Sequence, residues 1–249
     1  RRSSDLVKDI KKGKMIIVVD DPNRENEGDL VCSAQKVTPQ IINFMTKFGR
    51  GLVCVPVKGD RLDKLEIKTV EKKHGVISHD KISCAFTESV DYKNGTSTGI
   101  SAYDRAKTIR AIADGASKPS DFERPGHIFP LRYKEGGVLV RAGHTEASVD
   151  LALLAGLDGS AVICEIMNDD GTMARLPDLL IFAKKHKLKI ITVEELIKYR
   201  RSTEKLVKEV VTVNFPTKYG NFTLSLFEDK IKKETHLAII KGDVRNKKN

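Results

Sequence analysis

The stretch that decides the fold reads Met15-Ile-Ile-Val-Val19, then Asp20-Asp-Pro-Asn-Arg-Glu-Asn-Glu-Gly-Asp29, then Leu30-Val-Cys-Ser-Ala34. Short apolar runs rich in β-branched residues are typical of buried strands. The first run is far shorter than the roughly 20 apolar residues that a membrane-spanning helix needs. The sequence therefore predicts two buried strands joined by an acidic loop over residues 20–29.

Helices and strands alternate outward from this stretch. Thr38 and Pro39 are typical of a helix start, as N-cap and first helical residue. Apolar spacing predicts helices at 5–14, 38–47, 104–113, 147–155 and 177–187, and strands at 52–57, 84–90, 138–140 and 161–167. This interleaving predicts an α/β (α+β) fold, a layered mixed sheet with helices.

Charge and patterning divide the chain into a body and a basic C-terminal segment. The net charge is +10, yet 17 of the 44 Lys and Arg and only 8 of the 34 Asp and Glu lie at 184–249. The body is therefore mixed in charge, which argues against nucleic-acid binding. We expect one domain over 1–203 and a smaller unit of two or three strands over 204–249.

Several classes of site are excluded by missing motifs. The four cysteines are widely spaced, with no Cys-x-x-Cys pair for zinc or redox chemistry. No dinucleotide-binding glycine motif or P-loop is present. The chain opens at Arg1, so a leader cannot be read from it. We expect a cytoplasmic location or, if a leader was removed, an organelle such as a plastid, without membrane attachment.

The acidic loop is the first of three segments that could carry chemistry. Its five carboxylates within ten residues repel one another unless cations balance them. A hard divalent ion such as Mg²⁺ or Mn²⁺ would do so. The alternative, favoured for the loop taken alone, is a solvated acidic turn.

The second segment pairs two glycine and histidine motifs, Arg124-Pro-Gly-His127 and Arg141-Ala-Gly-His-Thr-Glu146. Backbone N–H groups at a helix start near Thr145, together with Arg141, could hold a phosphate. His144 could offer a neutral imidazole to a metal beside Glu25. The alternative is that these histidines are structural.

The third segment is Glu165, which period-two alternation places among apolar residues of a strand. Desolvation there would favour its protonated form and make it a candidate for proton transfer, unless it is a salt-bridged structural residue. The three segments together indicate a metal-assisted enzyme acting on a small anionic, phosphorylated substrate.

These segments resemble the 3,4-dihydroxy-2-butanone 4-phosphate synthase family over roughly residues 5–200. The resemblance rests on residues 20–29, Thr98-Gly-Ile-Ser-Ala102 with Asp104-Arg105, residues 124–131, residues 141–150 and residues 163–175. It implies a homodimeric lyase that uses Mg²⁺ or Mn²⁺ to convert D-ribulose 5-phosphate into L-3,4-dihydroxy-2-butanone 4-phosphate and formate, a step of riboflavin biosynthesis.

The resemblance also implies roles for individual residues. Glu25 and His144 match metal ligands, and His127 and Glu165 match the family's two essential residues. The substrate-contacting positions are Arg24, Glu25, Asp29, Arg141, Ala142, Gly143, His144, Thr145 and Glu165.

The C-terminal segment resembles the beginning of a GTP cyclohydrolase II domain, through residues 215–220 and 236–243. No cysteine follows Cys164, so the zinc-binding cysteines of that family are missing, and we expect no GTP cyclohydrolase II activity. Two alternatives remain open, a catalytically silent assembly module and an RNA-associated protein that uses the basic tail.

Overall fold

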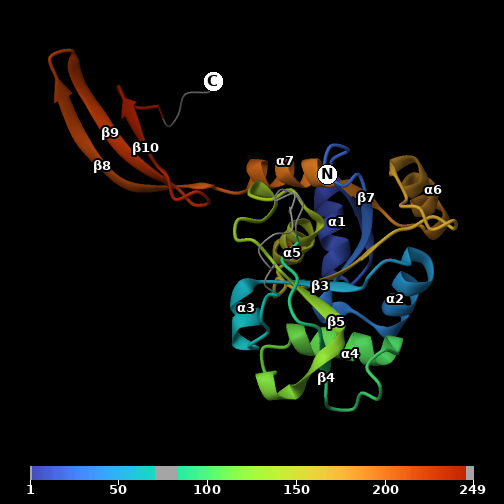
Figure 1. Ribbon diagram of the computed structural model, residues 1–249. Helices are drawn as coiled ribbons and strands as arrows, with labels where there is room; N and C mark the ends of the chain where they lie inside the picture. The colour runs from blue at the N-terminus through green and yellow to red at the C-terminus, as the bar shows by residue number, and fades with distance from the viewer. Residues whose placement is uncertain (1, 71–83, 245–249) are drawn as a thin grey trace, which may run out of the picture. The chain divides into compact units, whose positions relative to one another are not determined.

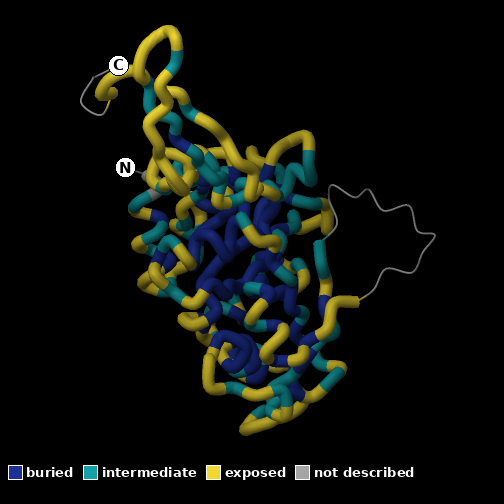
Figure 2. The backbone as a smooth tube through the Cα atoms, turned by 90° about the vertical axis from the view of Figure 1, so that its left-hand side faces the viewer, coloured by how far each residue is buried: buried dark blue, intermediate teal, exposed yellow. Residues whose placement is uncertain are grey.

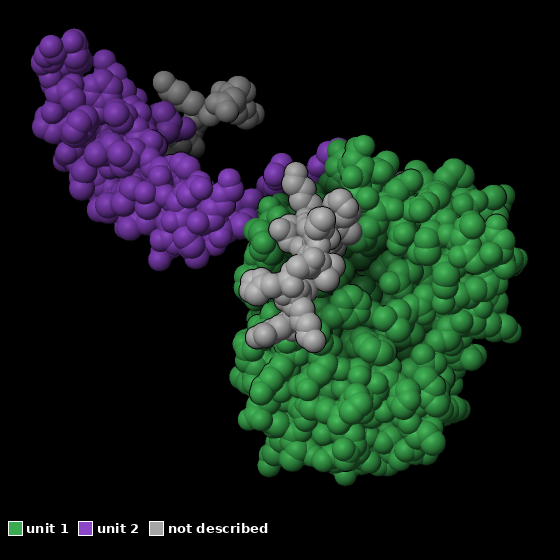
Figure 3. All heavy atoms as spheres, viewed as in Figure 1, with its two compact units in different colours: residues 1–197 green, residues 198–249 purple. Residues whose placement is uncertain are grey.

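The computed structural model describes residues 2–70 and 84–244. The chain forms two compact units, Arg1–Ile197 and Lys198–Asn249 (Figure 3). Each unit has its own sheet. The division of function between residues 1–203 and 204–249 stays a prediction.

The first unit is built on one seven-stranded mixed sheet, in the order β4-β5-β3-β6-β2-β1-β7 (Figure 1). The β3–β5 and β1–β7 pairs are parallel and the other neighbours are antiparallel. The strands are β1 (Ile16–Val19), β2 (Gly28–Ser33), β3 (Cys54–Val57), β4 (Val90–Tyr92), β5 (Phe122–Arg132), β6 (Ala161–Glu165) and β7 (Ile190–Thr192).

Helices cover both faces of this sheet, because its central strands are apolar on both sides. Along β1, Ile17 and Val19 belong to one hydrophobic cluster and Ile16 and Val18 to the other, as strand alternation requires. The first cluster takes in residues of α2 (Pro39–Phe44), α3 (Gly59–Lys64), α4 (Ala102–Ala113) and α6 (Leu176–His186). The second takes in residues of α1 (Arg2–Lys11), α5 (His144–Leu154) and the start of α7 (Val193–Thr203). Figure 2 shows the resulting buried interior of this unit.

The predicted fold class is confirmed, as are most of the elements near the acidic loop. Strands β1 and β2 flank that loop, and the side chain of Thr38 accepts the N–H of Ile41 as the N-cap of a helix that begins at Pro39. This helix continues as a π-helical segment, η2 (Met45–Gly49), that the apolar spacing did not predict.

Two predicted strands are wrong. Residues 138–140 lie in and after a 3₁₀ turn, η4 (Gly137–Leu139), because Gly136 and Gly137 both take positive φ and turn the chain. Within 84–90, Phe86 and Thr87 make only isolated bridges. Phe86 pairs with β5 beside Pro130, which has no N–H with which to continue a ladder.

The second unit is a three-stranded antiparallel sheet, in the order β10-β9-β8. Its strands are β8 (Val207–Thr217), β9 (Gly220–Asp229) and β10 (Thr235–Ile240), and their side chains are mostly exposed.

Elsewhere in the described chain are two further 3₁₀ turns, η1 (Ala34–Lys36) and η3 (Pro119–Asp121). No helix within the described ranges is long and apolar enough to cross a bilayer.

Candidate active site

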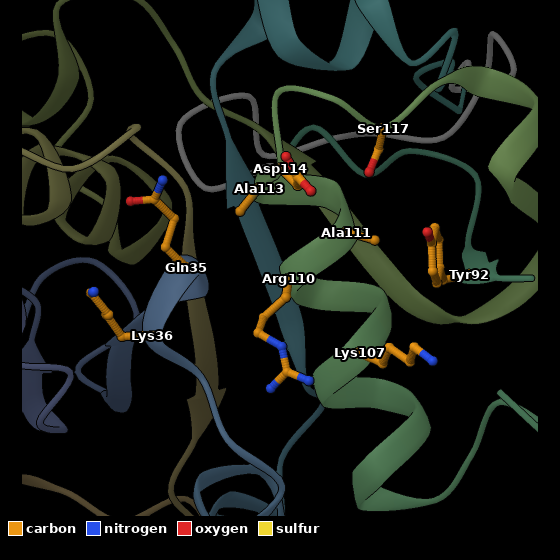
Figure 4. A pocket seen from close by; sticks show the side chains of 9 residues that line it. All are labelled: Gln35, Lys36, Tyr92, Lys107, Arg110, Ala111, Ala113, Asp114 and Ser117. Carbon is orange, nitrogen blue, oxygen red and sulfur yellow. The ribbon is translucent and has the colours of Figure 1, made fainter. Parts of the chain in front are cut away.

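Two cavities of the first unit differ in what lines them. The larger, of about 580 Å³, we name the basic pocket; it is lined by Gln35, Lys36, Tyr92, Lys107, Arg110, Ala111, Ala113, Asp114 and Ser117. Its cations point away from one another (Figure 4). Lys107 donates to Gly95 O at 3.0 Å and Arg110 to Val37 O at 2.9 Å. Lys107 and Arg110 are thus held by backbone carbonyls, and the three cations of this pocket do not converge on one point.

The smaller cavity, of about 280 Å³, we name the acidic pocket. It lies where the acidic loop, the start of α5 and strands β2, β3, β5 and β6 meet. Its lining residues are Arg24, Glu25, Glu27, Asp29, Cys54, Cys84, Phe86, Leu131, His144, Thr145, Ile163 and Glu165. It thus brings together most of the residues that the sequence singled out.

Asp20 accepts hydrogen bonds from three other residues of the acidic loop. Its side chain is fully buried, and its Oδ1 accepts the N–H of Glu27 at 2.9 Å. Oδ2 accepts Arg24 Nη1 at 2.7 Å and the N–H of Glu25 at 3.2 Å. A buried carboxylate that accepts several donors holds its donors in place. The sequence alone could not rank Asp20 above the other carboxylates of the loop.

Arg175, the N-cap residue of α6, holds the same loop. Its Nη1 donates to Glu25 O at 2.7 Å and to Asn26 O at 2.5 Å. Asn26 is in the left-handed region, with φ of 55°, a conformation that is uncommon for residues other than glycine. Sequence reasoning assigned Arg175 no role, because nothing in the pattern shows that it reaches a loop 150 residues away.

Three ligand-type side chains converge at the loop. Asp20, Glu25 and His144 each offer one atom, and these atoms lie within 4.8 Å of one another. His144 Nδ1 is 3.5 Å from Glu25 Oε2. Carboxylate oxygens with one imidazole form a donor set suited to a divalent cation.

Two buried polar atoms at this cluster have no hydrogen-bond partner among the residues that the structure describes. They are Asp29 Oδ1 and His144 Nε2, which lie 3.9 Å apart, too far for a hydrogen bond. Buried polar atoms are rarely left unpaired unless an ion, water or ligand completes them. The residues present therefore fit a bound cation.

Electrostatics in the acidic pocket reflect burial and crowded charge. Burial alone would lower the pKa of His144, but the carboxylates of Asp29, Glu25 and Asp20 outweigh it and raise the pKa to about 9. Burial raises the pKa of Asp29 to about 7, although His144 opposes the change. Burial also raises the pKa of Glu25, but hydrogen bonding to His144 and the charge of Arg24 bring it below its ordinary value.

Glu165 faces the pocket from the end of β6, register-paired with Asp29 on β2. It is half-buried rather than fully buried among apolar residues as its alternation predicted, because it is the last residue of the strand. Its Oε2 accepts the N–H of Leu52 at 2.8 Å.

The Arg141-to-Thr145 stretch runs from η4 into the first turn of α5. Arg141 pairs with buried Glu146 at 2.6 Å, and Ala142 packs on the second hydrophobic cluster. A Cβ built on Gly143 would lie 2.9 Å from Arg141 Nη1 and 3.0 Å from Arg24 Nη2. The guanidinium groups of Arg141 and Arg24 thus both approach Gly143, which has no side chain to exclude them and lies at the N-terminus of α5.

Four predicted site residues do not line the acidic pocket. Arg141, Ala142 and Gly143 directly precede His144, which does line it, whereas His127 lies on another element. It lies on β5, four residues before Leu131, or about 13 Å along an extended strand. Its Nδ1 is 2.6 Å from Asp91 Oδ2, and its side chain is 44% exposed. A single copy of the chain therefore does not bring His127 to Glu25, His144 and Glu165.

Comparisons with known proteins agree with one another. The family model for 3,4-dihydroxy-2-butanone 4-phosphate synthase matches residues 4–199, and that for GTP cyclohydrolase II matches residues 208–248. A "Riboflavin biosynthesis protein RibBA" of Endomicrobium trichonymphae is 61% identical over 98% of this chain and 60% of its own length. A "3,4-dihydroxy-2-butanone 4-phosphate synthase" of Neisseria meningitidis is 51% identical over 96% of this chain and 64% of its own.

Solved structures give the same result. A two-domain 3,4-dihydroxy-2-butanone 4-phosphate synthase from A. baumannii is similar with a TM-score of 0.84 and 46% identity, over 97% of this chain and 70% of the other. A synthase "in complex with two Magnesium ions" has a TM-score of 0.75 and 38% identity, over 82% and 98%. The chain spans about 60% of the length of the RibBA relative.

Proposed function

The chain belongs to the 3,4-dihydroxy-2-butanone 4-phosphate synthase family, and from this premise we propose that it converts D-ribulose 5-phosphate into L-3,4-dihydroxy-2-butanone 4-phosphate and formate. The observation that carries the proposal is the acidic pocket, where Asp20, Glu25 and His144 converge beside two unpaired buried atoms. A solvated acidic turn, the alternative for the loop taken alone, would not bury the Asp20 side chain as this structure does.

Glu25 and His144 would hold the metal, Mg²⁺ or Mn²⁺, with Asp20 fixing the loop and close enough to serve as a third ligand. Support comes from their mutual distances and from the related synthase solved with two magnesium ions. When bound, the ion supplies positive charge that polarises the ketose oxygens of the substrate.

Arg24, Asp29 and the stretch Arg141, Ala142, Gly143, His144 and Thr145 would bind the substrate. The helix N-terminus and the two guanidinium groups over Gly143 provide positive charge for a phosphate. Asp29, with a pKa raised to about 7 by burial, can exist in either protonation state near neutral pH and can exchange a proton with a substrate hydroxyl.

Glu165 would move protons during the dehydration and carbon migration that precede formate loss. It reaches the pocket from β6 with one carboxylate oxygen held by Leu52 N–H. A Glu165→Gln variant that kept full turnover would remove this role.

His127 supports the prediction of a homodimer. The family resemblance makes His127 essential, yet in one copy it lies outside the acidic pocket, exposed and fixed by Asp91. A second copy could present its own His127 to the pocket across a two-fold interface.

The activity is tested by formate release from D-ribulose 5-phosphate by the whole chain, with Mg²⁺ and after chelation. We expect metal-dependent formate and equimolar four-carbon product. The absence of metal-dependent formate would reject the proposal and favour a catalytically silent module.

The shared site is tested by mixing two inactive variants, His127→Ala and Glu165→Ala. If His127 serves the partner's pocket, random mixed dimers regain one intact site, and about a quarter of the wild-type activity returns. No recovery in proven mixed dimers would place His127 in its own copy's site.

The location of the chain remains a prediction. Two plant relatives, from Arabidopsis thaliana, are named chloroplastic, which is consistent with the cytoplasmic or plastid location expected here.

A further inference from the structure

A tight turn joins the π-helical segment η2 to β3 and pairs with the end of β6, where Glu165 lies. Arg50 is left-handed, with φ of 72°, and its N–H donates to Met45 O at 3.0 Å, five residues back. Such π-type turns are often found at functional sites. Residues 50–52 therefore leave the helix through a left-handed residue and a π-type hydrogen bond.

This turn is fastened to the end of β6 by backbone hydrogen bonds. Gly51 N–H donates to Glu165 O at 3.2 Å, and Met167 N–H donates to Gly49 O at 2.9 Å. The side chain of Arg50 donates to Met167 O at 3.1 Å. The backbone of residues 49–52 is thus held in register with the backbone that carries Glu165.

The next N–H of the turn reaches the Glu165 side chain itself. Leu52 N–H donates to Glu165 Oε2 at 2.8 Å. Among the described residues, no hydrogen bond to the other oxygen, Oε1, is found. One carboxylate oxygen is anchored by a backbone donor, and the other is left for the contents of the acidic pocket.

Gly51 makes this approach possible through its lack of a side chain. A Cβ at Gly51 would lie 2.4 Å from Glu165 Oε2 and 2.7 Å from both Glu165 N and Glu165 O. Its φ is outside the left-handed region, so glycine is required here for space. Any larger residue must push the turn away from Glu165.

We propose that the Gly51–Leu52 peptide is a positioning element for the reaction, which fixes the Glu165 carboxylate through Leu52 N–H. The proposal rests on the proton-transfer role proposed for Glu165. Rigid placement matters because a misplacement of about 1 Å in a reacting group can cost about 10²-fold in rate. A backbone donor that is itself held by neighbouring backbone hydrogen bonds gives that rigidity without losing side-chain entropy.

The first test observes the hydrogen bond directly by NMR, without any assay of activity. In the ¹⁵N-labelled whole chain, we expect the Leu52 amide proton to move upfield in the Glu165→Ala variant, because its carboxylate acceptor is gone. The Gly51 amide is the matched control, since it bonds to the backbone oxygen of residue 165 and should keep its shift. An unchanged Leu52 amide would overturn the proposal.

The second test separates positioning from binding. We expect Gly51→Ala to lower kcat by about 10²-fold, with KM and the Mg²⁺ dependence within about twofold of wild type. Gly115→Ala is the control variant, because a Cβ at Gly115 meets nothing within 4 Å; it should keep wild-type kcat. Unchanged kcat in a folded Gly51→Ala variant would overturn the proposal. A loss of Mg²⁺ affinity as large as the loss of kcat would also overturn it.

The outcomes also distinguish this proposal from the function on which it rests. If Gly51→Ala fails to fold, the NMR comparison on Glu165→Ala still decides whether the hydrogen bond exists. If the Leu52 amide shifts but Glu165→Ala retains full turnover, the hydrogen bond stands, the proton-transfer role of Glu165 is wrong, and the positioning role is overturned with it.

Discussion

The basic pocket and the acidic pocket differ in opposite senses in volume and in the number of buried polar atoms that lack a hydrogen-bond partner. The basic pocket has about twice the volume, yet two of its cations are engaged by carbonyl groups. The acidic pocket is smaller, but within the described part of the chain Asp29 Oδ1 and His144 Nε2 are buried there without hydrogen-bond partners. Unpaired buried atoms cost free energy that a ligand can recover, so they point to the site better than volume does.

The largest effect is expected when a metal-ligating side chain of the acidic pocket is replaced. We expect Glu25→Gln to lower kcat/KM for formate release by about 10³-fold, since a metal ion supplies several kcal/mol and each 1.4 kcal/mol is tenfold. Calorimetry should show weakened Mg²⁺ binding as well. Glu27→Gln, in the same loop but outside the ligand cluster, should lose no more than about 10- to 100-fold. Equal losses in the two variants would mean that the charge of the loop, and not a metal ligand, determines activity.

Arg175→Lys tests the support of the loop rather than the ligands. Lysine cannot reproduce the guanidinium contacts to Glu25 O and Asn26 O, and loss of such support costs about 10- to 100-fold in metal affinity. Mg²⁺ affinity measured by calorimetry should fall accordingly. Arg61→Lys is the matched control, because Arg61 also donates to backbone carbonyls, at Ile112 and Asp114, but far from the loop; a similar loss there would point to general destabilisation.

The acidic pocket should also give the metal-free protein a pH-dependent stability. The pKa of His144 is raised to about 9 by the surrounding carboxylates, against the effect of burial. Folding then favours the protonated imidazole, so this stabilisation is complete below the ordinary value near 6.5 and is lost as pH rises to 9.

Chemical denaturation of the chelated protein between pH 6.5 and 9 measures this loss. The free energy of unfolding should fall with pH more steeply in wild type than in His144→Asn, which lacks the titrating group. Parallel curves would contradict the assigned charge of His144. Added Mg²⁺ should stabilise more strongly at higher pH, because binding displaces the proton.

The smallest effect is expected at the basic pocket. Lys36→Ala should change kcat/KM and Mg²⁺ affinity by less than about twofold, as is usual for an exposed side chain away from a site. Kinetic analysis under the conditions used for Glu25→Gln measures it. A tenfold loss would show that the basic pocket takes part in the reaction.

Local sequence patterns predicted those parts of the fold that depend on neighbouring residues. The apolar runs on either side of residues 20–29 are β1 and β2, and Thr38-Pro39 begins a helix as capping chemistry requires. Strand β5 was missed because Pro125 and Gly126 lie inside it and read as a turn. Its eleven residues are held by pairing with β3 and β4, which are distant in sequence.

The candidate site was predicted in its composition but not in its geometry. Glu25, Asp29, His144 and Glu165 do line one pocket. The roles of Asp20, Arg175 and the Leu52 N–H depend on long-range contacts that no periodicity encodes. The separation of His127 from the pocket could not be foreseen either, because the order of motifs along the chain does not give the distances between their residues.

Crystallography with Mn²⁺ shows whether the acidic pocket is the metal site of this chain. Crystals of the whole chain grown with Mn²⁺ should give an anomalous difference peak between Glu25 and His144, and the peak should vanish in Glu25→Gln. Manganese bound elsewhere, with no peak between the Glu25 and His144 side chains, would show that the acidic pocket is not the metal site.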